Sequence, residues 1–381
     1  MSPGIIGIGR AVPPGTLGQE QALRLAEQCC AGSAEEVDRL RRLFQRSGVE
    51  TRQFVVARTP QPPAPDHLSR AAGNDSTRLL ETTVPFFPPR LHDQDHGPTT
   101  SERLAVYDEW ASALAHRAAS EALSRAGCDP SKITHLITVS CTGLRAPGVD
   151  IALIESLDLP RHVRRAHVGF MGCHAAINAL RLACDACRAD ANATVLIVCV
   201  ELCSVHFQYR GEGDRLLANA LFADGSAAAV VSNGNDGPRD AAATLRDFAS
   251  VIVPDSQECM TWSVGDHGFE MSLSLDVPDR IRRLLRPWMI EWLGRHDLSI
   301  GEVGSWAVHP GGPRILDAFI AALQLDRRAL EVSRQVLSRF GNMSSPTILF
   351  ILDELVRREA PRPIVAIAFG PGLTIEAALL E

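Results

Sequence analysis

The chain has 381 residues, of which 45% are hydrophobic, and a net charge of −7 at pH 7. It is long enough for one large or two medium globular domains, and its composition excludes disorder, collagen and coiled coil as the main organisation. Its 38 basic residues against 45 acidic ones form no basic stripe, which argues against nucleic-acid binding. No apolar run reaches the roughly 18 residues that span a membrane.

The first part of the chain predicts a strand, a long connection and a helix. Gly4–Gly9 is a short β-type run, and its GxG lacks the third glycine of a dinucleotide-binding loop. Residues 58–98, rich in proline, aspartate and histidine, predict a surface connection, with His92–His96 as a solvated loop in preference to a metal site. A capping box at Thr99 and apolar residues on one helix face predict a helix that ends at Gly127.

Strands and helices alternate over the rest of the chain. The predicted strands are His135–Cys141, Thr194–Val200, Ser305–Val308, Ile364–Phe369 and Leu373–Leu380, and the predicted helices include Arg314–Leu323 and Ser344–Arg357. This alternation is typical of a layered α/β fold. A cluster of glycine and asparagine near residue 233 predicts two α/β halves, residues 1–232 and 233–381.

Ten cysteines raise the question of disulfides or a metal. Residues 1–15 lack the basic and apolar regions of a secretory signal, so we expect a cytoplasmic location and reduced thiols. The single CxxC pair, Cys184 and Cys187, is more typical of buried helix cysteines than of metal ligands. We therefore expect no metal site.

A glycine-punctuated turn places a candidate nucleophile at the start of a helix. In VGFMGCHAAINALR, residues 168–181, Cys173 lies at or near the N-terminus of an alanine- and leucine-rich helix. Unpaired N–H groups and the positive end of the helix dipole stabilise a thiolate there and lower the thiol pKa. The alternative is a small buried hydrophobe, but the glycines favour a turn that directs the side chain into a cleft.

Three later motifs add polar groups and a pocket wall. His309 ends a strand before a rigid PGGP turn, at the sheet edge where α/β proteins bind ligands, with a structural histidine as an equal alternative. Asn342 in GNMSS is either a helix N-cap or a donor to a carbonyl oxygen, as half of an oxyanion hole. Gly372 in FGPGL belongs to a fixed loop suited to a pocket wall.

These motifs, in this order, resemble the signature of the type III polyketide synthases, the chalcone and stilbene synthase family of the thiolase superfamily. The resemblance rests on GCHAA at Cys173, HPGGP at His309, GNMSS at Asn342 and GPGLTIE ending at Glu376, and it covers most of the chain, least clearly residues 58–98. It implies a five-layered αβαβα fold of two similar halves, a homodimer, and a buried site reached by a coenzyme A tunnel.

The resemblance also implies the roles of three residues. Cys173, kept as a thiolate by the His309 imidazolium, would take the acyl group from an acyl-CoA. His309 and Asn342 would hold the malonyl-CoA carbonyl and stabilise the enolate that forms on decarboxylation and attacks the acyl group. No tightly bound metal, flavin or nicotinamide is expected, because loss of CO₂ supplies the carbanion. The chain is thus expected to be an acyltransferase that acts on CoA thioesters.

Other positions align with residues around the family's cavity. Phe207 and Met271 align with two gatekeepers between tunnel and cavity, and methionine is a departure from the family. Ser344 aligns with the pocket wall, and Cys141 and Ala146 align with a cavity-lining threonine and a methionine of plant members. The smaller or softer groups leave room for an aliphatic tunnel, so we expect a medium or long aliphatic starter that leads to alkylpyrones or alkylresorcinols.

Arg46 and Arg52 are the expected contacts for the phosphates of coenzyme A, because the arginine fork suits phosphate; a surface helix arginine is the alternative.

Three other functions remain open. One is a single condensation by an enzyme similar to 3-ketoacyl-acyl-carrier-protein synthase III, although HPGGP and GNMSS favour the polyketide synthases. The others are a Cys-His-Asn hydrolase and an inactive homologue that acts through its dimer surface.

Overall fold

The computed structural model describes residues 3–57, 84–209, 213–233 and 242–381. The expected connection at 58–98 therefore lies partly outside the described residues, and so does most of the cluster that predicted a boundary near 233. The strands are β1 (Gly4–Ala11), β2 (Thr16–Gly18), β3 (Thr51–Gln53), β4 (His135–Ser140), β5 (Arg164–Gly169), β6 (Thr194–Leu202), β7 (Asp224–Ser232), β8 (Ala243–Ile252), β9 (Met260–Gly265), β10 (Gly268–Leu273), β11 (Ser305–Val308), β12 (Ile364–Gly370) and β13 (Thr374–Leu380).

Most of the helices flank these strands. They are α1 (Gln19–Cys30), α2 (Ala34–Gln45), α3 (Thr100–Ala126), α4 (Val149–Ser156), α5 (Ala175–Ala189), α6 (Gly213–Leu221), α7 (Val277–Gly294), α8 (Pro313–Leu323), α9 (Glu331–Phe340) and α10 (Pro346–Arg357). The predicted strands and helices agree with these bounds to within about two residues.

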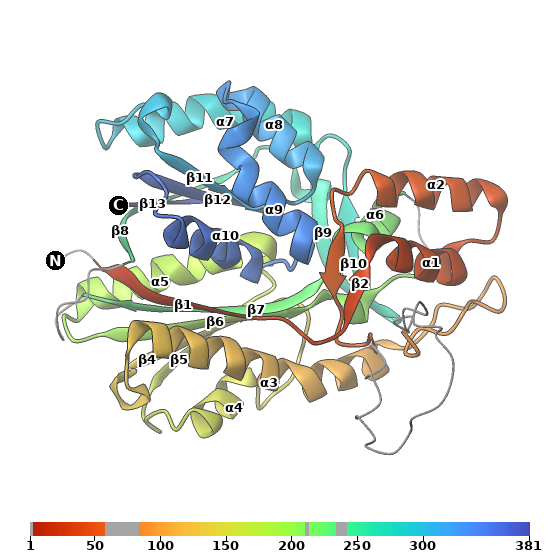
Figure 1. Ribbon diagram of the computed structural model, residues 1–381, viewed down its shortest axis with the longest axis horizontal. Coiled ribbons are helices and arrows are strands. Elements are labelled where there is room, and N and C mark those ends of the chain that lie inside the picture. Colours follow the sequence, from red (N-terminus) through yellow and green to blue (C-terminus); the bar gives the residue numbers. More distant parts are fainter. Residues whose placement is uncertain (1–2, 58–83, 210–212, 234–241) are drawn as a thin grey trace, which may run out of the picture.

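The main sheet is mixed and has the strand order β11-β12-β13-β8-β1-β7-β6-β4-β5. Strand β1 pairs with β7 along its length but with β8 only at Gly4 and Ile5, so the sheet has two blocks joined at a narrow contact. Helices α5 and α10 lie between the blocks, α7 and α8 cover one outer face, and α3 and α4 cover the other (Figure 1). The expected five-layered αβαβα fold is confirmed.

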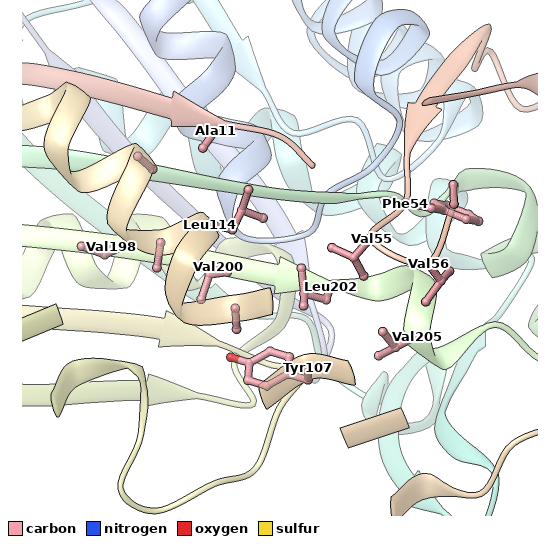
Figure 2. Close-up of a cluster of buried hydrophobic side chains, with 14 of the residues drawn as sticks. Ala11, Phe54, Val55, Val56, Tyr107, Leu114, Val198, Val200, Leu202 and Val205 are labelled. Carbon is pink, nitrogen blue, oxygen red and sulfur yellow. The ribbon is translucent and has the colours of Figure 1, made fainter. Parts of the chain in front are cut away.

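The long helix α3 forms as the sequence predicted. The Thr99 N–H donates to the Glu102 carboxylate at 2.7 Å, and Gly127 ends the helix with a φ of 49°. One face of α3, with Tyr107 and Leu114, packs on Val200 of β6 and its neighbours (Figure 2). Because a hydrophobic stripe is buried here against a sheet, packing adds to the capping in stabilising the helix.

The two glycines of the GxG motif in β1 lie against helix α3. A Cβ on Gly9 would lie 2.1 Å from the carbonyl oxygen of Ala118, and one on Gly7 would lie 2.5 Å from that of Ala122. The two glycines are therefore required for α3 to approach β1 closely. This agrees with the prediction that the motif is a strand and no dinucleotide loop.

The helix expected from Ser344 begins two residues later, at Pro346. Ser344 has a φ of 57°, in the left-handed region that an α-helix of L-residues does not use. Residues 342–345 therefore form a separate turn, and its side chains belong to the site described below.

Candidate active site

Cys173 lies in a 3₁₀ turn, Gly172–His174, directly before α5. Gly172 has a φ of 75°, and a Cβ there would lie 2.5 Å from Cδ of Pro371. Any other residue at position 172 would be strained and would collide with this proline. The GPG loop can therefore pack against the turn of Cys173 only because position 172 is a glycine. Gly372, whose φ is 126°, belongs to the same loop, which therefore forms a wall beside Cys173.

Burial is the largest influence on the pKa of Cys173. Burial raises the pKa of the Cys173 thiol to about 11. Hydrogen bonds from the side chains of Ser344 and Asn342 act in the opposite direction, and the charge of Glu201 raises the pKa further. These hydrogen bonds do not outweigh burial, so the pKa of the thiol stays above its ordinary value.

His309 follows β11 and is fully buried. Its backbone N–H donates to the carbonyl of Ile367 on β12 at 2.9 Å, while neither ring nitrogen has a hydrogen-bond partner among the residues that the structure describes. Burial, and then the charge of His174, lower the pKa of His309 to about 3. Each of these shifts favours the neutral form of its residue, whereas the resemblance implies a resting thiolate–imidazolium pair.

Asn342 is held by both its backbone and its side chain. Its N–H donates to the carbonyl of Leu221, and its carbonyl accepts from Ala223, both at 2.9 Å, in an isolated β-bridge with Phe222. Its Oδ1 accepts from the N–H of Ser344 at 2.8 Å. Since Oδ1 is occupied, Nδ2 is the group that the amide offers as a donor, as an oxyanion-hole residue requires.

Glu201 is a buried carboxylate at this site that the sequence analysis missed. It accepts from the N–H of Cys141 at 2.9 Å, and from the hydroxyls of Thr142 and Ser345, each at 2.7 Å. Burial raises the pKa of Glu201 to about 7. It connects the loop after β4 to the turn before α10. The one signal in the sequence was a lone carboxylate in the apolar strand TVLIVCVEL.

The aligned cavity residues lie in two environments. Cys141 is beside the nucleophile turn, because its Sγ accepts from the N–H of Gly172 at 3.1 Å. Met271 lines a small cavity with Phe207, but the ring of Phe207 also packs 5.4 Å from that of Phe87 in the core. Phe222, which the sequence analysis did not select, lines the same cavity and is bridged to Asn342. Phe222 is therefore the phenylalanine that is bridged directly to the turn of Asn342.

The two arginines expected to bind phosphate differ in exposure. Arg46 is exposed at the C-terminal end of α2. Arg52 is fully buried, and its guanidinium donates to the carbonyls of Asn219 at 2.8 Å and Ala220 at 2.5 Å. The expectation that Arg52 contacts coenzyme A is corrected accordingly. Arg52 has a structural role, because its guanidinium donates to carbonyls at the end of α6.

A thiol at the start of a helix, a buried imidazole and a side-chain amide on a five-layered fold are the features expected of condensing enzymes of the thiolase superfamily. Residues 87–236 and 245–381 match the family models for the N-terminal and C-terminal domains of chalcone and stilbene synthases. The chain belongs to this family. It is a type III polyketide synthase and therefore an acyltransferase.

Several relatives support this assignment. The alpha-pyrone synthesis polyketide synthase-like protein Pks18 of Mycobacterium tuberculosis is 33% identical over 289 residues, 74% of each chain. The 1,3,6,8-tetrahydroxynaphthalene synthase of Streptomyces peucetius is 30% identical over 99% of this chain and 92% of its own. The crystal structure of PKS-I from the brown alga Ectocarpus siliculosus, 30% identical, superposes with a TM-score of 0.85 over 100% of this chain and 98% of its own.

Proposed function

We propose that Cys173 takes an acyl group from an acyl-CoA and that malonyl-CoA, after decarboxylation, condenses with it and the product cyclises. The observation that carries this proposal is the fully buried ring of His309, whose two nitrogens have no hydrogen-bond partner within the described part of the chain. A buried polar group without a partner costs about 1–3 kcal/mol. A thioester carbonyl bound at the ring would supply the missing acceptor.

In the first step, Sγ of Cys173 attacks the carbonyl carbon of the acyl-CoA while its proton passes to the ring of His309. The bond to the coenzyme A sulfur then breaks, and the leaving thiolate takes that proton. Burial favours the neutral form of both residues, so in this proposal His309 acts as a base only while the new bond forms. The donors on His309 and Asn342 face the developing negative charge on the carbonyl oxygen.

In the second step, malonyl-CoA places its thioester carbonyl against His309 and the Nδ2 of Asn342. The bond to the carboxylate breaks, CO₂ leaves, and its electron pair forms an enolate whose oxygen is held by the two donors. The enolate carbon attacks the acyl thioester on Cys173 and releases the thiolate. One proton enters from solvent for each condensation, which returns the site to its neutral state.

Coenzyme A would bind at the C-terminal end of α2. Arg39, Arg42 and Arg46 are exposed there at spacings of three and four residues, which places them on one helix face. Arginine on such a face suits the phosphates of the cofactor. No tightly bound cofactor is part of the proposal, since the CoA thioesters are substrates.

We further propose that the chain acts as a homodimer in the cytoplasm. Strand β5 is at the edge of the sheet, and Arg164 to His167 on it are exposed. Leu144 and Met171 are also exposed beside it, at 52% and 39%. An open sheet edge next to apolar side chains favours association with a second copy. In the part of the chain that the structure describes, no helix could span a membrane.

The proposed halves, residues 1–232 and 233–381, would place Cys173 on one and His309 and Asn342 on the other.

Incubation with labelled malonyl-CoA and a set of acyl-CoA starters tests the reaction, and we expect released CO₂ and cyclised polyketides. A linear β-ketoacyl product formed only with a carrier protein would indicate the single-condensation alternative. Folded, reduced protein that gives neither CO₂ nor product would refute the proposal.

A further inference from the structure

Arg52 of β3 is a charged side chain in the interior of the protein that has no acidic partner. It is fully buried, and within the described part of the chain its hydrogen bonds go to carbonyl and amide oxygens, with no carboxylate among them. Burial lowers the pKa of Arg52 to about 9. Because removing a charge from water is costly unless polar groups satisfy it, these oxygens take the place of a carboxylate.

The oxygens belong mainly to the C-terminal end of α6. Nη1 of Arg52 donates to the carbonyls of Asn219 at 2.8 Å and Phe222 at 3.1 Å. Nη2 donates to the carbonyl of Ala220 at 2.5 Å and to Oε1 of Gln19. The last carbonyls of a helix lack partners within the helix and carry the negative end of its dipole. A cation with two separate donor nitrogens therefore matches this helix end.

The segment that Arg52 holds is the one that fixes Asn342. Phe222 and Asn342 form an isolated β-bridge. In this bridge the N–H of Asn342 donates to the carbonyl of Leu221, and its carbonyl accepts from the N–H of Ala223, both at 2.9 Å. Two of the carbonyls that Arg52 binds flank that of Leu221 in the chain. A shift of the guanidinium would thus move the backbone on which the position of the Asn342 amide depends.

The residues just before Arg52 hold the other side of the bridge. The hydroxyl of Thr51 donates to the carbonyl of Arg339 at 2.8 Å, and the N–H of Glu50 donates to that of Ser338 at 2.8 Å. Both carbonyls lie near the end of α9, shortly before the bridge begins. This short segment therefore contacts both parts of the chain that meet in the bridge.

We propose that Arg52 is a positioning residue for the oxyanion donor. It sets the place of the Asn342 amide through the carbonyls at the end of α6. The inference rests on the proposed function, in which Nδ2 of Asn342 holds the enolate oxygen after decarboxylation. Loss of the guanidinium should therefore impair decarboxylation of malonyl-CoA more than acyl loading of Cys173.

The selectivity follows from the different support of the nucleophile. The N–H of Gly172 donates to Sγ of Cys141, and Gly172 packs against Pro371. Arg52 donates to none of these residues. Its replacement should leave the turn of Cys173 in place.

The test uses Arg52→Lys in the full-length protein. Lysine keeps the charge, but its single nitrogen cannot replace the two nitrogens of the arginine fork. CO₂ release from labelled malonyl-CoA measures decarboxylation, and intact-protein mass spectrometry measures the rate of loading from an acyl-CoA. The ratio of decarboxylation to loading should fall at least about tenfold, because small displacements of a catalytic group have effects of this size. The loss should appear in kcat, with KM for malonyl-CoA near that of wild type.

A double-mutant cycle separates positioning from general destabilisation. In the Asn342→Ala background the donor that Arg52 positions is absent. Adding Arg52→Lys there should lower decarboxylation by less than about twofold. A residue that only stabilises the fold would lower it by the same factor in both backgrounds.

Arg103→Lys is the matched control. Arg103 of α3 is also fully buried and donates to three carbonyls, those of Pro98, Val205 and Phe207. These carbonyls are not part of the bridge, so the ratio of decarboxylation to loading should stay near that of wild type even where stability falls. Thermal unfolding compares the stability of the two lysine variants.

Gln19→Leu decides the outcome if Arg52→Lys does not fold. It removes one partner of the guanidinium but leaves the arginine in place, so it should lower the same ratio by a smaller factor.

Two results would overturn the inference. One is a folded Arg52→Lys, or Gln19→Leu in its place, with the ratio of wild type. The other is an equal loss from Arg52→Lys in the wild-type and Asn342→Ala backgrounds. Failure of the proposed function looks different, because wild type would then release no CO₂ and form no adduct on Cys173, and the inference would fall with it.

Discussion

The N–H of Gly172 donates to Sγ of Cys141 at 3.1 Å, and this bond joins the loop after β4 to the turn that carries the nucleophile. The N–H of Cys141 donates in turn to Glu201, which also accepts from Ser345. The position of Cys173 is therefore linked through buried hydrogen bonds to the turn that contains Asn342. These bonds connect elements that are far apart in the sequence. The next three predictions concern the residues and turns that they join.

Glu201 should act as a positioning residue. Glu201→Gln keeps one accepting oxygen for Cys141 and Thr142, but an NH₂ group replaces the oxygen that accepts from Ser345, so that hydroxyl must reorient and the free energy of unfolding should fall by about 1–3 kcal/mol. The variant should also lower kcat more than it raises KM, because the catalytic turns lose their alignment. Ser345→Ala removes only one of the bonds and should have a smaller effect in both measurements. Wild-type kcat and unfolding in Glu201→Gln would contradict this role.

Gly172→Ala should disable acyl loading. A Cβ would meet Cδ of Pro371 at 2.5 Å, and the residue would have to keep a φ of 75°, a strain of order 1–3 kcal/mol. The turn must shift, so intact-protein mass spectrometry should show little acyl adduct on Cys173. Gly294→Ala is the matched control, because a Cβ at this helix position meets nothing within 4 Å. It should load normally, and equal loading by both variants would show that the turn tolerates a side chain.

The two half-reactions should separate by mutation. Cys173→Ala should form no acyl adduct yet still release CO₂ from malonyl-CoA, because His309 and Asn342 hold the enolate without it. Asn342→Ala should lower decarboxylation more than loading, by about 10²–10³-fold for the loss of one oxyanion donor. Mass spectrometry measures the adduct and labelled malonyl-CoA measures the CO₂. Loss of both activities in Cys173→Ala would contradict this division of roles.

Much of the fold, and the three residues that we propose as catalytic, could be selected from the sequence because their signals are local. The capping box at Thr99, the strand Ser305–Val308 and the glycines around Cys173 each depend on a few neighbouring residues. Motif order then identified the family. Such signals can be recognised in a single sequence because the residues that produce them are adjacent in the chain.

The missed or corrected features depend on contacts between distant segments. Arg52 was expected from the sequence to contact phosphate. In the structure it donates instead to carbonyls of α6, which lie more than 160 positions away in the chain. Trp262 was overlooked, although Met260, Trp262 and Val264 alternate with polar residues before a glycine-bounded turn, a hairpin pattern. Its bond to Cys141 joins residues 121 positions apart. Burial and partners of this type cannot be read from spacing.

The protonation state of the nucleophile can be tested by its reaction with iodoacetamide. Only the thiolate reacts, and below the thiol pKa its fraction rises tenfold for each pH unit. Because the pKa of Cys173 is about 11 and that of His309 about 3, the alkylation rate in the free protein should rise continuously from pH 6 to pH 9. A resting thiolate–imidazolium pair would instead give a rate that is constant across this range. Peptide mass spectrometry isolates the signal of Cys173, and the partly exposed Cys128 serves as the internal reference.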